Sequence, residues 1–233
     1  AGWAAFQELE AEGGLLAALA SGALAGRIAT VAADRDRRIA KRTWPITGVS
    51  EFPLLGELRP TPVDWPEIDH RPPVPLTGTP TSATPFALRR IAEPFETLRA
   101  AAEGTQPQPS VFLANIGTGA QYTARATFAA NLFGTAGVVA VGDTGYASAA
   151  DAAAAYRASG APVAVICGTD ASYAEVAVDY AQALKGAGAT RVYLAGRPGE
   201  HRTEFEAAGI DEFVSMGVDV LDVMTRLLAQ LGV

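Results

Sequence analysis

The sequence predicts an α/β fold in which five parallel strands form a doubly wound sheet over residues 86–233. Two observations support this prediction. Short apolar runs alternate regularly with helical patterns from about residue 111 to the end of the chain. The runs are also continuously apolar, as in parallel strands that are buried on both faces.

The individual elements follow from these patterns. The expected strands are VFLANI, GVVAV, PVAVICG, RVYLAG and EFVSM, at residues 111–116, 137–141, 162–168, 191–196 and 212–216. The expected helices cover about 120–133, 148–159, 173–186, 200–208 and 220–231. This arrangement is flavodoxin-like, and such sheets bind ligands beyond the carboxyl ends of their strands, where the strand order reverses. The loop that follows the first strand is therefore the candidate site.

Two further zones precede the sheet. Residues 1–50 are expected to be helical, because apolar residues recur at helical spacing, GG at 13–14 interrupts them, and a second helix covers about 24–42. The run PITGVSEF at 45–52 is expected to be a short strand. Residues 51–85 carry most of the prolines and are expected to be an extended linker or belt. A helix over 85–103 follows, with Pro94 marking a kink or a restart.

The composition excludes several classes of function. The formal net charge of −7 argues against a nucleic-acid partner, and the basic run DRDRRIAKR at 34–42 is interleaved with acids, as on a solvated helix face. No apolar run is long enough to cross a membrane and the start of the sequence lacks a secretion signal, so we expect a cytoplasmic protein without a membrane partner. One cysteine and two separated histidines, His70 and His201, predict neither a disulfide nor a metal cluster.

The loop NIGTGAQYTARATF at 115–128 matches two common motifs poorly. A dinucleotide-binding loop needs a third glycine where Tyr122 stands. A phosphoacceptor domain needs carboxylates and a lysine at the strand ends, where this chain has Asn115, Cys167 and Arg197. Neither interpretation accounts for the loop.

A flavodoxin-like FMN site, or a simple phosphate site, stays open. Thr118, Thr123 and the backbone amides of the loop could hold a phosphate at a helix start. Tyr146 and Tyr173 are then the aromatic residues available to stack on a flavin ring. The alternative function is thus an independent FMN-binding or phosphate-binding module.

Three other residues could carry chemistry. Asp143 and Asp170 follow the second and third strands and could form an acid and base pair, although such residues more often cap helices or turns. Cys167 ends an apolar strand, where cysteine usually packs as a small hydrophobic residue.

Four blocks of sequence give the whole chain a resemblance to the methylmalonyl-CoA mutase family, and specifically to the C-terminal part of its small (β) subunits. The blocks are AGWAAFQELEAEGG, RIATVAADRDRRIAKRTWPITGVSEFP, LRRIAEPFETLRAA and VFLANIGTGAQYTARATFAANLFGTAG. The resemblance implies a cobalamin-binding-type domain over 86–233. It also implies that the biological protein is longer, with residues 1–50 as the helical end of an N-terminal barrel.

The family's cobalamin-binding patterns are altered in this chain. In the catalytic subunits, D-x-H-x-x-G after the first strand supplies the histidine that ligates cobalt, and an S-x-L and a G-G line the slot for the dimethylbenzimidazole tail. The corresponding positions here are Asn115, Gly117 and Ala120, then Cys167 and Thr169, then Ala195 and Gly196. The resemblance therefore implies a degenerate site that binds no cobalamin. Tyr122 and Tyr146 are hypothesised to fill the volume of the missing corrin ring.

The function implied by the resemblance is that of a non-catalytic small subunit. It would pair as a heterodimer with the large, catalytic subunit of an isomerase that interconverts methylmalonyl-CoA and succinyl-CoA in propionate metabolism. Adenosylcobalamin is expected in that partner, and we expect no catalytic, cofactor-binding or metal-binding residue in this chain.

Overall fold

The computed structural model describes residues 2–57 and 89–233, and the chain divides into two compact units. The first unit comprises residues 1–35 and 56–89, and the second comprises residues 36–55 and 90–233. Most of the predicted linker and His70 lie outside the described residues.

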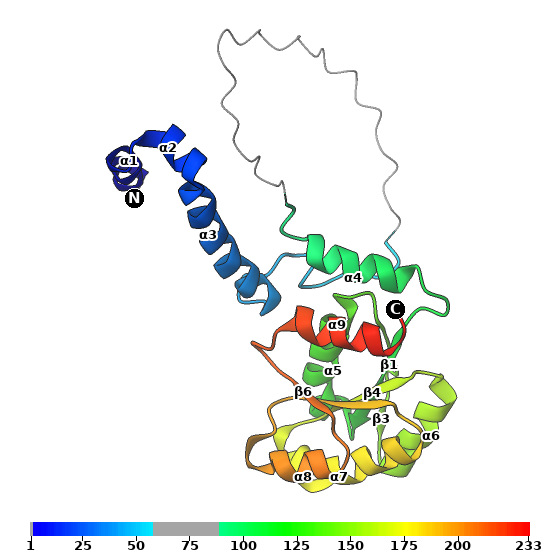
Figure 1. Ribbon diagram of the computed structural model, residues 1–233. Helices are drawn as coiled ribbons and strands as arrows, with labels where there is room; N and C mark the ends of the chain where they lie inside the picture. Colours follow the sequence, from blue (N-terminus) through cyan, green and yellow to red (C-terminus); the bar gives the residue numbers. More distant parts are fainter. Residues whose placement is uncertain (1, 58–88) are drawn as a thin grey trace. The chain divides into compact units, whose positions relative to one another are not determined.

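The first unit contains the predicted N-terminal helices (Figure 1). They are α1 (Gly2–Ala11), α2 (Gly14–Ser21) and α3 (Ala23–Ala40), whose last turns belong to the second unit. Gly13 separates the first two with a φ of +100°, a conformation that favours glycine. Within the described chain no single helix could span a bilayer, and α2 and α3 meet the length and composition needed only as a pair bent by 72°.

The second unit is built on a parallel sheet with the order β2-β1-β4-β5-β6. Its strands are β1 (Ser110–Ile116), β2 (Val139–Val141), β4 (Val163–Cys167), β5 (Arg191–Ala195) and β6 (Glu212–Val214). These are the five predicted strands, and their order confirms the flavodoxin-like prediction. A two-residue strand that the sequence did not predict, β3 (Gly145–Tyr146), pairs with the end of β1 on the same side as β2.

Helices cover both faces of the sheet (Figure 1). One face packs against α4 (Glu93–Glu103), α5 (Gly119–Gly134) and α9 (Val220–Gln230), and the other against α6 (Ala149–Ser159), α7 (Asp170–Gly186) and α8 (Arg202–Ala207) after the short η1 (Gly199–His201). Along β1, Val111 and Leu113 enter the first core while Phe112 and Ala114 enter the second. This alternation explains why the strand is apolar at every position.

Two expectations around the sheet are wrong in whole or in part. The predicted strand at 45–52 is wrong, because the segment forms turns with a single bridge between Thr47 and Glu51. Its chain reversal is held by Ser50, whose buried hydroxyl accepts from the Ile46 amide at 2.9 Å. The helix predicted over 85–103 is wrong for residues 89–92, which form no helix, because α4 begins at Glu93 with Pro94 in its first turn, where no hydrogen bond is lost.

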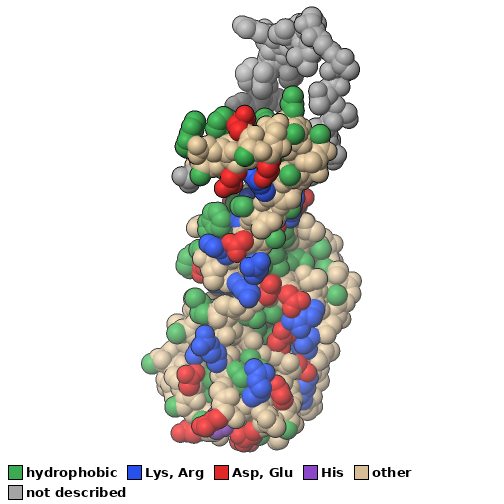
Figure 2. Space-filling model, turned by 60° about the vertical axis from the view of Figure 1, so that its left-hand side comes forward, with side chains coloured by type: hydrophobic (Ala, Val, Ile, Leu, Met, Phe, Trp, Pro, Cys, Tyr) green, Lys and Arg blue, Asp and Glu red, His purple; other side chains and the backbone are tan. Residues whose placement is uncertain are grey.

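The charges of the second unit are mixed rather than segregated. On the face in Figure 2, basic and acidic side chains are interspersed. Glu212, for example, bonds both Arg191 at 3.2 Å and Arg226 at 2.7 Å. On this face the described side chains therefore do not form the uniform basic stripe that is typical of nucleic-acid binding.

Candidate functional site

The loop after β1 is tied to the neighbouring strand by its backbone. Asn115 is buried, and its side-chain amide donates to the Thr144 carbonyl oxygen at 3.1 Å. Gly117 has a φ of +73° and donates its N–H to the Tyr146 carbonyl oxygen at 2.9 Å. These bonds join the first strand to the segment around β3, so the loop is part of the sheet edge.

The space beside Gly117 is filled by Gln121. The Gln121 Oε1 atom accepts from the Thr118 amide at 2.8 Å and from the Thr118 hydroxyl at 3.0 Å. A Cβ atom at position 117 would overlap this carboxamide. Ala120 lies exposed in the same first turn of α5. The helix start is therefore capped from within, and the Thr118 amide, one of those that a phosphate could use, already has a partner.

A local signal for this arrangement exists in the sequence. Thr118 and Gln121 have the T-x-x-Q spacing of a capping box, in which the fourth residue folds back on the helix start. The cap formed by Gln121 was not among the features predicted from the sequence.

The carboxyl ends of β4 and β5 are joined by Tyr173, a residue of α7. Its hydroxyl accepts from the Gly168 amide at 2.9 Å and lies 2.8 Å from the Ala195 carbonyl oxygen and 3.3 Å from that of Ile166. Since a hydroxyl carries one proton, the shorter contact to Ala195 is the main donated bond. Burial raises the pKa of Tyr173, so the hydroxyl keeps the proton that it donates.

The ring of Tyr173 lies between two glycines. A Cβ atom at Gly168 would stand 3.3 Å from Cε1 of the ring, and one at Gly196 would stand 3.1 Å from Cε2. The ring is 3 % exposed. It therefore fills the space between the positions that the resemblance assigned to the tail slot, and no local sequence pattern marks it for this place.

The remaining slot positions have structural roles. Cys167 is fully buried, and burial raises the pKa of its thiol, so it stays protonated and is a poor nucleophile. Thr169 is exposed at the start of α7, where its hydroxyl accepts from the Ser172 amide at 3.1 Å. The expectation that Cys167 packs as a hydrophobic residue agrees with its burial.

The two candidate aspartates do not cap the helices. Ser148 and Thr169 are the caps of α6 and α7. Asp170 is instead ion-paired with Arg125 at 3.0 Å, and Asp143 accepts the Tyr122 hydroxyl on its backbone carbonyl at 3.2 Å. The helix half of the capping prediction is thus wrong for both residues, because the hydroxyls of Ser148 and Thr169 hold the N-cap positions.

The groups needed by a flavin or a metal are not assembled among the described residues. Tyr173 is too buried to stack on a flavin, and Tyr146 packs on Phe112 with ring centroids 5.6 Å apart. His201 contacts Glu204 at 3.2 Å, and no group of three potential metal ligands occurs in residues 2–57 and 89–233. Clefts of about 310 Å³ beside Gly117 and about 460 Å³ beside Arg197 border the sheet edge.

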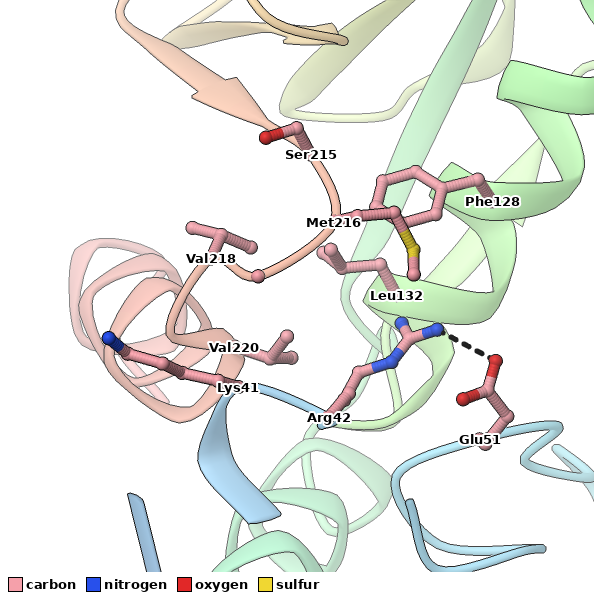
Figure 3. Close-up of a pocket in the computed structure, with 10 residues that line it drawn as sticks. Lys41, Arg42, Glu51, Phe128, Leu132, Ser215, Met216, Val218 and Val220 are labelled. Atoms are coloured by element: carbon pink, nitrogen blue, oxygen red, sulfur yellow. Dashed lines mark hydrogen bonds and ion pairs between the residues drawn. The ribbon is translucent and has the colours of Figure 1, made fainter. Parts of the chain in front are cut away.

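A pocket away from this edge contains Arg42, the last residue of the basic run (Figure 3). Its side chain is 9 % exposed, bonds Glu51 at 3.0 Å and lies 5.7 Å from the ring centroid of Phe128. The solvated-face prediction is therefore wrong for this residue. The pocket's free volume is about 20 Å³, which holds roughly one water molecule. The pocket is therefore a tightly packed contact between residues 36–55 and α5.

Comparisons with known proteins agree along the whole chain. A family model described as methylmalonyl-CoA mutase matches residues 1–72. The methylmalonyl-CoA mutase small subunit of Streptomyces virginiae is 46 % identical over 100 % of this chain and 35 % of its own length. The probable small subunit of Mycobacterium bovis is 39 % identical over 99 % and 34 %, and that of Propionibacterium freudenreichii subsp. shermanii is 33 % identical over 100 % and 35 %. The chain spans about a third of the length of the curated relatives it matches.

Proposed function

This chain belongs with the methylmalonyl-CoA mutase small subunits, to part of which it is homologous over its whole length, and on that premise we propose that it is a non-catalytic part of such a subunit. The subunit supports a large, catalytic chain in a cytoplasmic heterodimer. The assembled isomerase interconverts methylmalonyl-CoA and succinyl-CoA, as a step of propionate metabolism. Adenosylcobalamin is held by the large chain and not by this one.

The observation that carries the proposal is the pairing of Gly117 with Gln121. Glycine has no side chain with which to ligate cobalt, and the place where an imidazole would begin is taken by the Gln121 carboxamide. The carboxylate that would accept a hydrogen bond from such an imidazole and orient it is replaced by Asn115, whose amide donates to the Thr144 carbonyl oxygen. The residues present therefore do not fit the lower face of cobalamin, and no step of the reaction is assigned to them.

The same geometry counts against the alternative module. An FMN phosphate at this loop would compete with Gln121 for the Thr118 amide, which already donates to that carboxamide. A flavin ring would need an exposed aromatic face, and the Tyr173 ring is 3 % exposed. A scaffold role requires neither Thr118 nor Tyr173 to bind a ligand.

The test is reconstitution with a cognate large subunit. The small subunit and the large subunit are co-expressed, with an affinity tag on the small one, and the purified complex is analysed by gel filtration, cobalt analysis and a mutase assay. We expect both chains to elute together with one cobalt per pair. The small subunit alone is expected to lose added adenosylcobalamin on gel filtration.

Substitutions separate a scaffold from a catalyst. Asp143→Asn, Asp170→Asn and Cys167→Ser are expected to leave kcat of the assembled complex within about twofold, whereas loss of one catalytic proton-transfer group typically costs 100-fold or more. A cobalamin spectrum retained by the small subunit alone would refute the proposal. So would a hundredfold fall in kcat for one of these variants in a complex that still assembles.

A further inference from the structure

We propose that Tyr173 is a built-in replacement for a planar ligand, and that its ring closes a latent slot for a benzimidazole-like heterocycle between the carboxyl ends of β4 and β5. The inference deepens the proposed function. It rests on that function only for the identity of the ligand that the ring replaces.

Two glycines border the Tyr173 ring. Gly168 and Gly196 follow neighbouring parallel strands, and the Tyr173 ring touches the Cβ positions of both. Neither glycine has a side chain, and the ring lies where a Cβ atom on either one would crowd it. Ile116 of β1 packs beside Gly168, with its Cδ1 atom 3.1 Å from the Cβ position of that glycine. The ring is thus bordered by the ends of β4 and β5, and Ile116 supports Gly168 from β1.

The Tyr173 hydroxyl satisfies two backbone groups at the strand ends. It occupies one backbone donor, the Gly168 amide, and one principal acceptor, the Ala195 carbonyl oxygen. Both groups are buried and lie beyond Ile166 and Leu194, the last pair of the β4–β5 ladder, where a buried polar group needs a partner. A planar ring that carries one acceptor and one donor matches this pair. Phenols and N-unsubstituted benzimidazoles have that chemistry.

The Tyr173 ring, which acts as a plug, would block the tail slot even if the cobalt ligand were restored. Restoring a histidine at position 117 would leave the slot closed, because Tyr173 is held by α7 and not by the loop after β1. The chain thus has two independent obstacles to cobalamin, Gln121 beneath the metal position and Tyr173 in the tail slot. Clefts still border the sheet edge, but the Gly168 amide and the Ala195 carbonyl oxygen are satisfied without a ligand.

The experiment reopens the slot in the full chain. Tyr173→Gly removes the plug, and 5,6-dimethylbenzimidazole and phenol are the probes. Binding is followed by thermal unfolding and by the amide NMR signals of Gly168 and Gly196. The matched control is Tyr180→Gly, two turns further along α7, which removes an equally buried tyrosine whose hydroxyl bonds only the Tyr146 carbonyl oxygen.

We expect Tyr173→Gly to bind either probe saturably, with shifts at both glycine amides and about a tenfold gain in the folding equilibrium constant at ten times Kd. The parent chain and Tyr180→Gly are expected to show no shift at these amides. A folded Tyr173→Gly chain that shows no shifts would overturn the inference, as would a parent chain that shows them.

A second measurement keeps the inference testable if Tyr173→Gly does not fold. Tyr173→Phe keeps the ring and removes only the hydroxyl, so we expect hydrogen exchange at the Gly168 amide to speed up at least tenfold, while the probes still fail to bind. An unchanged rate of hydrogen exchange at the Gly168 amide would refute the proposal that Tyr173 closes the slot. These measurements need no large subunit, so their failure is distinct from a failure of the heterodimer proposal.

Discussion

The Tyr173 hydroxyl lies 2.8 Å from the Ala195 carbonyl oxygen, so a side chain from α7 ties together the ends of two neighbouring strands. The same hydroxyl accepts from the Gly168 amide. A ligand-binding α/β sheet usually leaves this edge open. Here a tyrosine closes the part of it between β4 and β5, and the first two of the following predictions concern this edge.

Tyr173→Phe should destabilise the fold by about 1–3 kcal/mol, because it leaves a buried amide and a buried carbonyl without partners. Urea unfolding measures the loss. Tyr156→Phe is the control, since that buried tyrosine donates one longer bond, 3.2 Å, to Pro162. Its loss should be about 1 kcal/mol or less, and equal losses in the two variants would contradict the bridging role of Tyr173.

Gly117→Ala should cost more stability than Gly160→Ala. Both glycines have left-handed φ values, +73° and +69°, so both variants carry a similar backbone strain of about 1–2 kcal/mol. Only position 117 also displaces Gln121 from the start of α5, which adds about 1 kcal/mol for the lost cap. Nothing lies within 4 Å of a Cβ at Gly160. The difference between the two unfolding free energies tests the clash, and it should shrink when Gln121→Ala is present in both chains.

Arg42 and Glu51 should show a coupling of about 1–3 kcal/mol in a double-mutant cycle with Arg42→Gln and Glu51→Gln. The Arg42 side chain is 9 % exposed and that of Glu51 is 26 % exposed, so the pair is only partly screened by solvent. Exposed pairs usually couple by less than about 1 kcal/mol. The exposed pair Arg202–Glu206 serves as the reference, and a coupling no larger than that of the reference would mean that Arg42 is held by packing alone.

Tyr193→Phe should flatten the loss of stability at alkaline pH. Burial raises the pKa of Tyr193 to about 12, whereas a tyrosine in the unfolded chain titrates near pH 10. Above about pH 10 the unfolded state loses this proton while the folded state keeps it, so stability falls by up to about 1.4 kcal/mol per pH unit until pH 12. The variant removes that contribution.

At pH 7, Tyr193→Phe should be neutral or stabilising. The buried hydroxyl has no hydrogen-bond partner within the described part of the chain, so its removal breaks no bond. Unfolding free energies measured between pH 7 and 12 check both statements. An unchanged alkaline slope would show that Tyr193 titrates in the folded chain as it does in the unfolded one.

Much of the fold was predictable because it depends on local patterns. The continuous apolar runs indicated the five parallel strands, and β1, which sends alternate residues to two cores, shows why no polar position interrupts them. The strand at 45–52 was predicted wrongly, since its apolar residues pack under turns held by Ser50 and Arg99 and not in a ladder. Strand β3 escaped prediction because two residues carry no periodicity.

The amino-acid sequence by itself determined what is missing at the candidate site: a glycine at position 117 has no side chain with which to ligate cobalt in any fold. It also contained the T-x-x-Q spacing that places Gln121 over the helix start. Only the tertiary structure decided that Tyr173 fills the gap between Gly168 and Gly196 and that Arg42 is enclosed beside Phe128. The physical reason is that Tyr173 and Gly196, like Arg42 and Phe128, come from elements distant in the chain, so their contacts depend on which strands and helices become neighbours and not on any local pattern.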